Sequence, residues 1–360
     1  MNAPARSASP WLARIPPGLF AVPVGLYGLA GAWRRSVGFG WPVADDIAWP
    51  LAWAATLTMA VLLVLYAAKA LRHPRVIGAE YAHPVPGSLL ALIPLSMLLA
   101  SIWFCEPRSV GWLAWVLCAL TLQGIVALRV VSTLATGAMP PAAVTPALSL
   151  PPVAGGFIGA MALASLGYPG WAALLFGMGL AGWALLEVRV LNSLFEGPMP
   201  EALRPTIGVE LAPPSVATLA AGTIWPALPG DVLIVGLGIA AGPVVAVMAR
   251  YHWWGRVPFS VGFWSFSFPL AALAGAVVEV VRRGGWPPVV GGIALLIASA
   301  VIAWLAVRTL VLLVNGRLLP PAPPVPAAAP LLPTAVPPSS PAAPSSPAAP
   351  SSPAAPSPPA

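Results

Sequence analysis

Long apolar stretches alternate with short polar connectors along most of the chain. Ten of these stretches have roughly the 20 residues that a helix needs to cross the hydrocarbon core of a bilayer. The connectors are short and contain Gly, Pro and charged residues, so we expect consecutive helices to lie side by side and antiparallel. The ten windows are Ile15–Trp33, Ala48–Ala68, Pro86–Phe104, Gly111–Val130, Leu148–Leu166, Gly170–Leu191, Ile207–Trp225, Val232–Ala249, Phe259–Val281 and Val289–Val314.

The first window has one feature of a signal peptide, because "GLAGAW" offers a loose small-residue cleavage site. Two other features favour a permanent spanning helix. The window is longer than the apolar core of a signal peptide, and it contains Pro23 near its centre, as the later odd-numbered windows contain prolines.

Prolines recur in the interior of every odd-numbered window. From one odd window to the next they lie 56 to 71 residues apart, which is the length of a helical hairpin and indicates a repeated unit. Among the even-numbered windows, only the eighth has a comparable proline, Pro243. The prolines of the odd windows are Pro23, Pro94, Pro151, Pro152, Pro213, Pro214 and Pro269.

This repeat predicts two rings of helices. A proline removes a backbone hydrogen bond and kinks a helix. A broken backbone at membrane depth is tolerated where it is buried in protein or lines a cavity. Prolines are also common in membrane helices generally, but that does not explain why they concentrate in the odd windows. We therefore predict an all-α polytopic membrane protein of ten helices in five hairpins, with kinked odd helices around a central pore.

The composition supports a membrane protein and excludes several other classes. The chain is 59% hydrophobic and 8% charged, whereas a soluble domain has about a quarter of its residues charged. The net charge of +7 comes from basic residues scattered through the connectors, without the basic patch that binds nucleic acid. Two cysteines, Cys105 and Cys118, make neither a disulfide framework nor a metal site.

The basic residues also predict the orientation, because cytoplasmic loops are enriched in Lys and Arg. With the N-terminus inside, twelve of the 17 basic residues lie on the cytoplasmic side, and the even number of windows brings the C-terminus there too. Arginine outnumbers lysine 16 to 1, which is typical of a GC-rich bacterial genome, so we expect the bacterial inner membrane. The five basic residues on the outer side are Arg34, Arg35, Arg108, Arg282 and Arg283.

Ionisable residues are scarce inside the windows, which argues against a strongly coupled pump. Glu187, Glu210 and Glu279 lie near window ends, and the histidines lie in connectors. No metal-ligand spacing, catalytic triad or phosphate-binding loop is found, so we expect neither an enzyme nor a cofactor. An uncharged pore can still pass anions, because helix N-termini after the breaks carry partial positive charge, and apolar constrictions can close it by excluding water.

Four segments resemble the tellurite-resistance/dicarboxylate transporter family, which includes bacterial TehA proteins and plant slow-type anion channels. They are "FAVPVGLYGLAGAW", "AEYAHPVPGSLLALIP", "RPTIGVELAPPSVA" and "FWSFSFPLAALA", within a resemblance that covers roughly residues 15 to 318. The resemblance implies five hairpins around a pore for small anions, inner helices kinked by proline, and a homotrimer with one pore in each protomer.

The resemblance also implies a phenylalanine in the ninth helix that plugs the pore. In this sequence it is Phe268, directly before Pro269, rather than Phe263 or Phe266. Because residues three or four apart share a helix face, Trp264, Ser265 and Ala272 are candidates to line the pore beside it. The alternative is that Phe268 only packs between helices.

Two residues are candidate modulators. Relatives tend to carry an uncharged amide where this chain has Glu210, and an ionised carboxylate near the inner mouth would repel anions unless it is protonated or paired, for example with Arg204. His83 lies in the matching segment "AEYAHPV". We expect a structural turn there, with pH sensing as the alternative because imidazole titrates near neutrality.

The sequence thus divides into residues 1–14, a ten-helix transmembrane domain over 15–318, and a Pro/Ala/Ser-rich tail over 319–360 that we expect to be disordered and cytoplasmic. For the function we predict an anion channel or channel-like transporter. The alternative is a proton-coupled secondary transporter of C4-dicarboxylate, sulfite or a tellurium oxyanion. A purely structural scaffold does not explain five broken helices.

Overall fold

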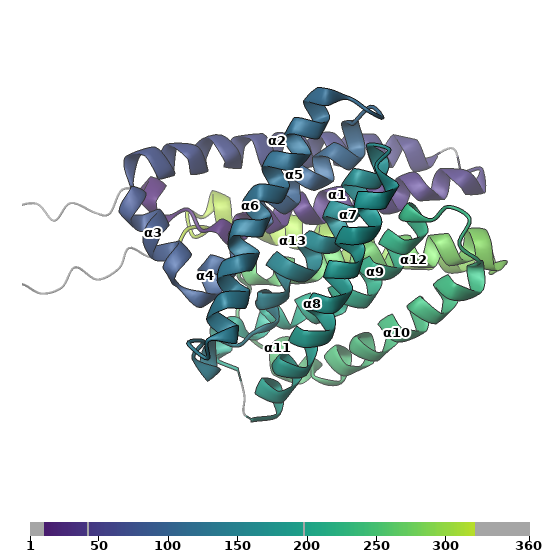
Figure 1. Ribbon diagram of the computed structural model, residues 1–360. Helices are drawn as coiled ribbons and strands as arrows, with labels where there is room; N and C mark the ends of the chain where they lie inside the picture. The colour runs from purple at the N-terminus through teal and green to yellow at the C-terminus, as the bar shows by residue number, and fades with distance from the viewer. Residues whose placement is uncertain (1–10, 42, 197–198, 321–360) are drawn as a thin grey trace, which may run out of the picture. The chain divides into compact units, whose positions relative to one another are not determined.

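The computed structural model describes residues 11–41, 43–196 and 199–320, and every regular element in these ranges is a helix (Figure 1). Nine helical segments of the described chain are long and apolar enough to cross a membrane. The prediction of an all-helical, multi-pass membrane protein is therefore confirmed.

Five long helices follow the even-numbered windows and are mostly exposed. They are α2 (Val43–Arg72), α6 (Val110–Ala135), α8 (Pro169–Glu196), α10 (Gly230–Ala249) and α13 (Pro288–Val314). At most 28% of each spanning stretch is buried inside the protein. Exposed leucine, valine and tryptophan side chains lie along them, as expected for surfaces that face lipid.

The odd-numbered windows form five composite segments, in which a short helix or turn precedes a regular α-helix. The regular parts are α1 (Ala21–Ser36), α5 (Leu92–Phe104), α7 (Gly155–Ser165), α9 (Ala212–Ile224) and α12 (Ser267–Gly284). The preceding parts are η2 (Pro17–Phe20), α4 (Pro84–Leu89), η5 (Pro146–Ser149) with the π-helical η6 (Leu150–Ala154), η7 (Glu201–Leu211) and η8 (Val261–Phe266). The remaining elements are η1 (Trp11–Arg14), η3 (Val37–Phe39), α3 (Pro74–Ala82), η4 (Pro141–Ala143) and α11 (Tyr251–Trp254).

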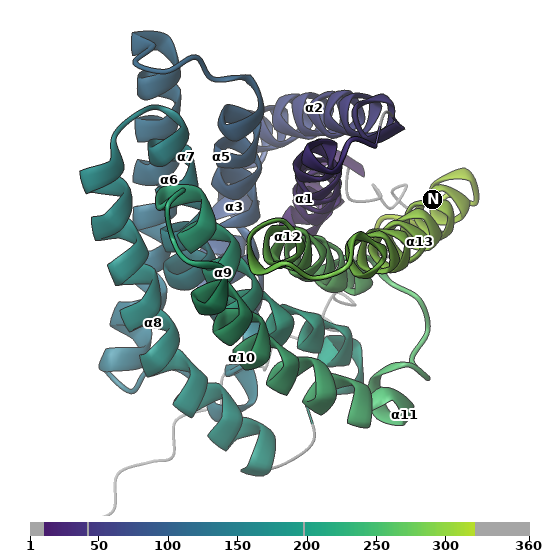
Figure 2. The ribbon, with the colours of Figure 1, turned by 90° about the vertical axis from the view of Figure 1, so that its right-hand side faces the viewer.

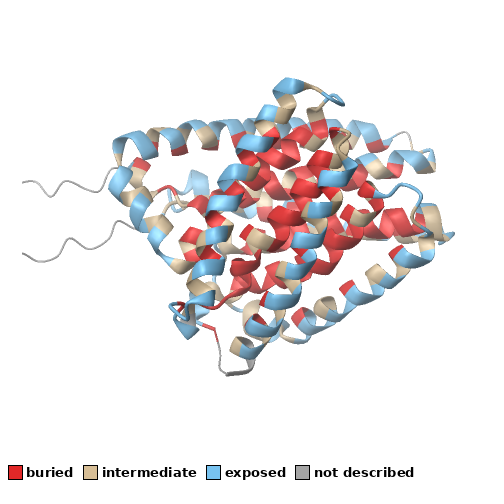
Figure 3. Cartoon of the chain, viewed as in Figure 1, coloured by how far each residue is buried: buried red, intermediate tan, exposed pale blue. Residues whose placement is uncertain are grey.

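Burial separates the two sets of helices. Between 67% and 89% of the odd spanning stretches after the first is buried, against 28% or less of the even ones. Figure 3 shows the buried residues gathered in the middle of the molecule, with exposed residues along α2, α6, α8 and α10. Figure 2 views the bundle nearly end-on and places α1, α9 and α12 centrally, with α2, α8 and α13 around them. This pattern agrees with an inner and an outer set of helices.

The first window differs from the others in length. Its regular helix α1 has 16 residues, and η2 extends it to begin at Pro17. It is not among the nine segments of the described chain that meet the length criterion, so a total of ten crossings remains a prediction. In addition, α2 begins at Val43, five residues before the predicted window, so that Pro50 lies in the interior of the helix and not in its first turn.

The prolines of the inner segments lie at the junctions between their two parts. Pro23, Pro94 and Pro269 are each the third residue of a regular helix, and Pro213 and Pro214 open α9. The first turn of a helix tolerates proline because its N–H groups have no partner within the helix. At four of the five inner helices the kink is thus a change of helix type, from 3-10 or π geometry to α geometry, whereas a turn at Leu90 and Ala91 separates the α-helices α4 and α5.

Gln123 stabilises the break in the third inner segment. Its side-chain Nε2 donates hydrogen bonds to the carbonyls of Leu150 at 3.1 Å and Pro151 at 2.9 Å, both within the π-helical turn. Gly155 leaves room for this amide, because a Cβ there would lie 2.4 Å from Nε2. An outer helix therefore supplies a side-chain donor to two carbonyls of the break, and the Leu150 carbonyl also accepts a hydrogen bond from the Gly155 N–H.

Candidate functional site: two chambers along the inner helices

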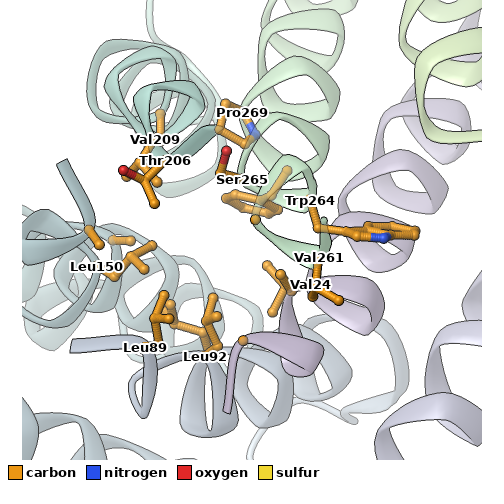
Figure 4. A pocket seen from close by; sticks show the side chains of 18 of the residues that line it. Val24, Leu89, Leu92, Leu150, Thr206, Val209, Val261, Trp264, Ser265 and Pro269 are labelled. Carbon is orange, nitrogen blue, oxygen red and sulfur yellow. The ribbon is translucent and has the colours of Figure 1, made fainter. Parts of the chain in front are cut away.

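An inner cavity of about 220 Å³ lies near the starts of the five regular inner helices. Figure 4 shows labelled side chains from these segments facing a common space. Each segment contributes to its wall; the lining residues include Ala21 and Val24, Leu92 and Leu95, Leu150 and Ala154, Thr206 and Val209, and Ser265 and Phe268. The regular inner helices begin at this level, so the partially positive ends of their dipoles converge on the cavity.

The cavity wall carries no charged side chain among the described residues. Its hydroxyls come from Thr206 and Ser265, and both already donate to backbone carbonyls, those of Leu203 and Pro205. An ion inside this chamber finds few groups that can replace its hydration shell. The chamber can therefore hold an anion only weakly.

Phe268 borders the inner cavity and is 8% exposed. Its ring lies directly against α1 at Gly28, where a Cβ would be 2.8 Å from the Phe268 Cδ2 atom. Gly28 thus provides the space that the ring occupies between α1 and α12. Closer approach of these helices also depends on Gly25, where a Cβ would be 2.2 Å from the Ser267 hydroxyl.

We expect Gly28→Ala to lower the free energy of unfolding by about 1 to 3 kcal/mol, because overpacking forces neighbouring side chains out of place. The same substitution should cost less in a Phe268→Ala background. Thermal unfolding of the detergent-solubilised variants measures both costs. Gly124→Ala is the matched control, since open space surrounds that Cβ position. An equal cost of Gly28→Ala in both backgrounds would contradict the contact with the ring.

The other predicted pore residues lie in different environments. Ser265 borders the cavity. Trp264 touches its wall, but the indole points away (Figure 4) and donates a 2.8 Å hydrogen bond to Thr309 on α13. Ala272 is buried and is not among the described residues that line the inner cavity.

Phe263 and Phe266 belong to another environment. They line a separate apolar cavity of about 550 Å³ beside α10 and α13, which Trp254 and Trp304 also line. The Phe266 and Trp254 rings lie 4.6 Å apart between centroids. Of the three phenylalanines in this stretch, Phe268 is the one at the inner cavity.

Neither candidate modulator is among the described residues that line the inner cavity. Glu210 is 8% exposed in η7, and no ion pair links it to Arg204 within the described part of the chain. Arg204 instead lies over the Trp253 ring at 5.3 Å. His83 caps α4, where its Nδ1 accepts a 3.3 Å hydrogen bond from the Val85 N–H.

A second cavity, of about 590 Å³, lies at the opposite ends of the same five inner helices. Its wall includes Gly31, Trp103, Ser165, Thr223 and Glu279. Four arginines also line it: Arg34, Arg35, Arg282 and Arg283. In the sequence these arginines appear only as outer charges, and nothing there predicts that they line one cavity. Each arginine pair directly follows an odd-numbered window, which predicts only that both pairs lie at the outer ends of inner helices.

Comparison with known proteins identifies the same family that the motifs indicate. The family described as "Voltage-dependent anion channel" matches residues 14–312. The chain is 27% identical over 311 residues to the tellurite resistance protein TehA homolog of Haemophilus influenzae, covering 84% of this chain and 92% of that protein. It is 27% identical over 161 residues to the guard cell S-type anion channel SLAC1 of Arabidopsis thaliana, which covers 44% of this chain and 29% of that protein. An uncharacterized transporter of Methanocaldococcus jannaschii is 24% identical over 255 residues, which covers 64% of this chain and 74% of that protein.

Proposed function

The chain belongs to the voltage-dependent anion channel family, whose members are anion channels or transporters, and we propose that it conducts small anions passively through the two chambers of its inner helices. The observation that carries this proposal is the inner cavity, which all five inner segments line and to which the described part of the chain contributes no charged side chain. Helix N-termini surround one chamber and arginines line the other. Both features favour anions over cations.

Phe268 closes the conduit in this proposal. Two observations support this role: the ring borders the inner cavity, and Gly28 leaves the space that the ring occupies against α1. An apolar constriction blocks ions because they cannot shed their water there at low cost. Opening then requires the ring to rotate or α12 to shift relative to α1.

The second candidate is a proton-coupled transporter of the same anions. Glu210 favours it, because a buried carboxylate within a spanning segment is a common proton site in transporters. A strong dependence of transport on the pH gradient that vanishes in Glu210→Gln would support this candidate. Transport that is unaffected by the gradient would support the channel.

We expect the selectivity among anions to follow the cost of dehydration, because the inner cavity offers few polar groups in exchange for water. Nitrate and iodide should permeate better than chloride, and sulfate least of all. Flux into proteoliposomes measures this order. An order that instead favours the most strongly hydrated anions would contradict a weakly coordinating pore.

The proposal includes a location and an assembly. The excess of basic residues on one side favours an orientation with both termini in the cytoplasm, and the excess of arginine over lysine favours the bacterial inner membrane. The family resemblance favours a homotrimer. Apart from Leu319 and Pro320, the predicted tail lies outside the described residues.

A further inference from the structure

The second cavity contains a cluster of five charged side chains from two helices that are adjacent in space. Arg34 and Arg35 end α1, while Glu279, Arg282 and Arg283 lie in the last turns of α12. α1 and α12 pack against each other along their length. The cluster therefore holds four guanidinium groups and one carboxylate around one space.

Glu279 is the centre of this cluster. Its side chain is 6% exposed and accepts contacts from three arginines, at 2.6 Å from Arg282, 3.0 Å from Arg283 and 3.6 Å from Arg35. Guanidinium groups bind carboxylates through paired N–H donors. The Glu279 carboxylate thus shows that the arginines of the second cavity can bind a carboxylate group.

Two of the arginines are fixed by hydrogen bonds to groups of the inner helices. Arg35 donates to the Gly31 carbonyl at 3.0 Å and to the Thr223 hydroxyl at 3.3 Å. Arg283 donates to the carbonyls of Gly222 at 2.8 Å and Trp225 at 3.4 Å, at the end of α9. These bonds join the ends of three inner helices, and they leave little donor capacity for a ligand.

The other two arginines have donors for a ligand. Arg282 is 44% exposed and contacts Glu279 through one terminal nitrogen. The Arg34 guanidinium lies 4.8 Å above the Trp103 ring, a contact that uses its face and leaves its edge N–H groups in the plane. Glu279 neutralises one of the four positive charges, so the cluster keeps an excess of positive charge that a purely structural network does not need.

We propose that this cavity is an anion-binding vestibule, in which Arg34 and Arg282 bind a small carboxylate, nitrate or halide before it enters the inner chamber. Arg35, Arg283 and Glu279 position the two binding arginines. The inference deepens the proposed function and rests on it for its role in transport, but the binding itself can be measured without transport. The low-dielectric walls of a charged cavity concentrate anions from solution.

Cys105 provides a reporter, because this half-buried thiol lines the same vestibule. In a Cys118→Ala background it is the single cysteine of the chain. Its reaction rates with an anionic and a cationic methanethiosulfonate of similar size give a ratio that reports the local potential. Burial raises the pKa of this thiol, with Arg34 opposing the rise, but the ratio cancels the thiolate fraction because both reagents attack the same group.

We expect the anionic reagent to react about tenfold faster than the cationic one, relative to their ratio on a free thiol. Arg34→Gln combined with Arg282→Gln should bring this ratio close to that of the free thiol. The matched control is Arg256→Gln with Arg317→Gln, two exposed arginines outside the vestibule, which should leave the ratio unchanged. Nitrate should also protect Cys105 from the anionic reagent in the parent protein, and should not in the Arg34/Arg282 variant.

The vestibule would be overturned if the ratio of the two reaction rates is the same in the parent protein and in the Arg34/Arg282 variant, and if nitrate does not protect Cys105. If Cys105 does not react, thermal unfolding of the parent protein and of the Arg34/Arg282 variant at rising nitrate concentration decides instead. Nitrate should raise the unfolding temperature of the parent relative to that of the variant, and an equal response of the two proteins would overturn the inference. If the Cys105 assay shows no anion binding but the protein still conducts anions, the vestibule is wrong and the proposed function stands. If the assay shows anion binding but the protein conducts no anions, the vestibule stands and the proposed function is wrong.

Discussion

Phe268→Ala is expected to raise anion flux through reconstituted protein by about tenfold or more, equivalent to lowering the barrier by about 1.4 kcal/mol or more. The phenyl ring borders the inner cavity and occupies the space beside Gly28. Removing it widens the apolar constriction and admits water, which lowers the cost of passage for an ion. Nitrate uptake into proteoliposomes, normalised to incorporated protein, measures the change.

Phe266→Ala is the matched control for this substitution. Phe266 has the same side chain, is 7% exposed against 8% for Phe268, and lines the separate aromatic cavity beside α10 and α13. It should leave the flux close to that of the parent protein. Equal flux in all three proteins, with Phe268→Ala shown to be folded, would mean that Phe268 packs between helices and does not close the pore.

Lys69→Met should lower the free energy of unfolding by about 3 kcal/mol, because it removes one partner of a buried ion pair. Lys69 is fully buried, and its Nζ donates to the Glu80 carboxylate at 2.5 Å and to the Ile15 carbonyl at 2.6 Å. The Tyr66 hydroxyl donates to the same carboxylate at 2.6 Å. Without the lysine, a partly buried carboxylate and the Ile15 carbonyl lose their cationic donor.

Thermal unfolding in detergent measures this loss. Arg72→Met is its control, because Arg72 lies in the same last turn of α2 and is exposed. Lys69→Met combined with Glu80→Gln should recover part of the stability, since the second change removes the uncompensated charge. A Lys69→Met protein as stable as the Arg72→Met protein would contradict a stabilising role for this pair.

The sequence predicted the two sets of helices because proline restricts the backbone locally. Each odd window carries its own break, and a broken helix at membrane depth needs cover from protein or a cavity. The helix type at each break could not be predicted from the sequence in the same way. Whether a turn closes as 3-10, α or π depends on partners from other helices, such as the Gln123 amide that bonds Leu150 and Pro151.

α-Helical spacing around Phe268 predicts Trp264, Ser265 and Ala272 as its neighbours on the pore face. Trp264 and Ser265 border the inner cavity, but the indole of Trp264 reaches Thr309 on α13. Ala272 is not among the described residues that line the cavity. Helical spacing predicts which face a residue shares, but it predicts neither the direction of a large side chain nor the depth at which a cavity ends.

The arginine vestibule depends on contacts between distant parts of the chain. Arg34 and Arg282 come together because α1 packs against α12, and no local pattern encodes that contact. The count of outer charges placed both on one side of the membrane, but sidedness alone does not bring side chains to one cavity. Only the arrangement of the helices does so.

The central claim is passive anion conduction, and the reversal potential of the Phe268→Ala protein in a planar bilayer tests it most directly. Under a nitrate gradient with equal pH on both sides, the potential should approach the Nernst value for nitrate. Imposing a pH gradient should not move it. A reversal potential that shifts with the pH gradient, or that follows the cation gradient, would contradict passive anion conduction.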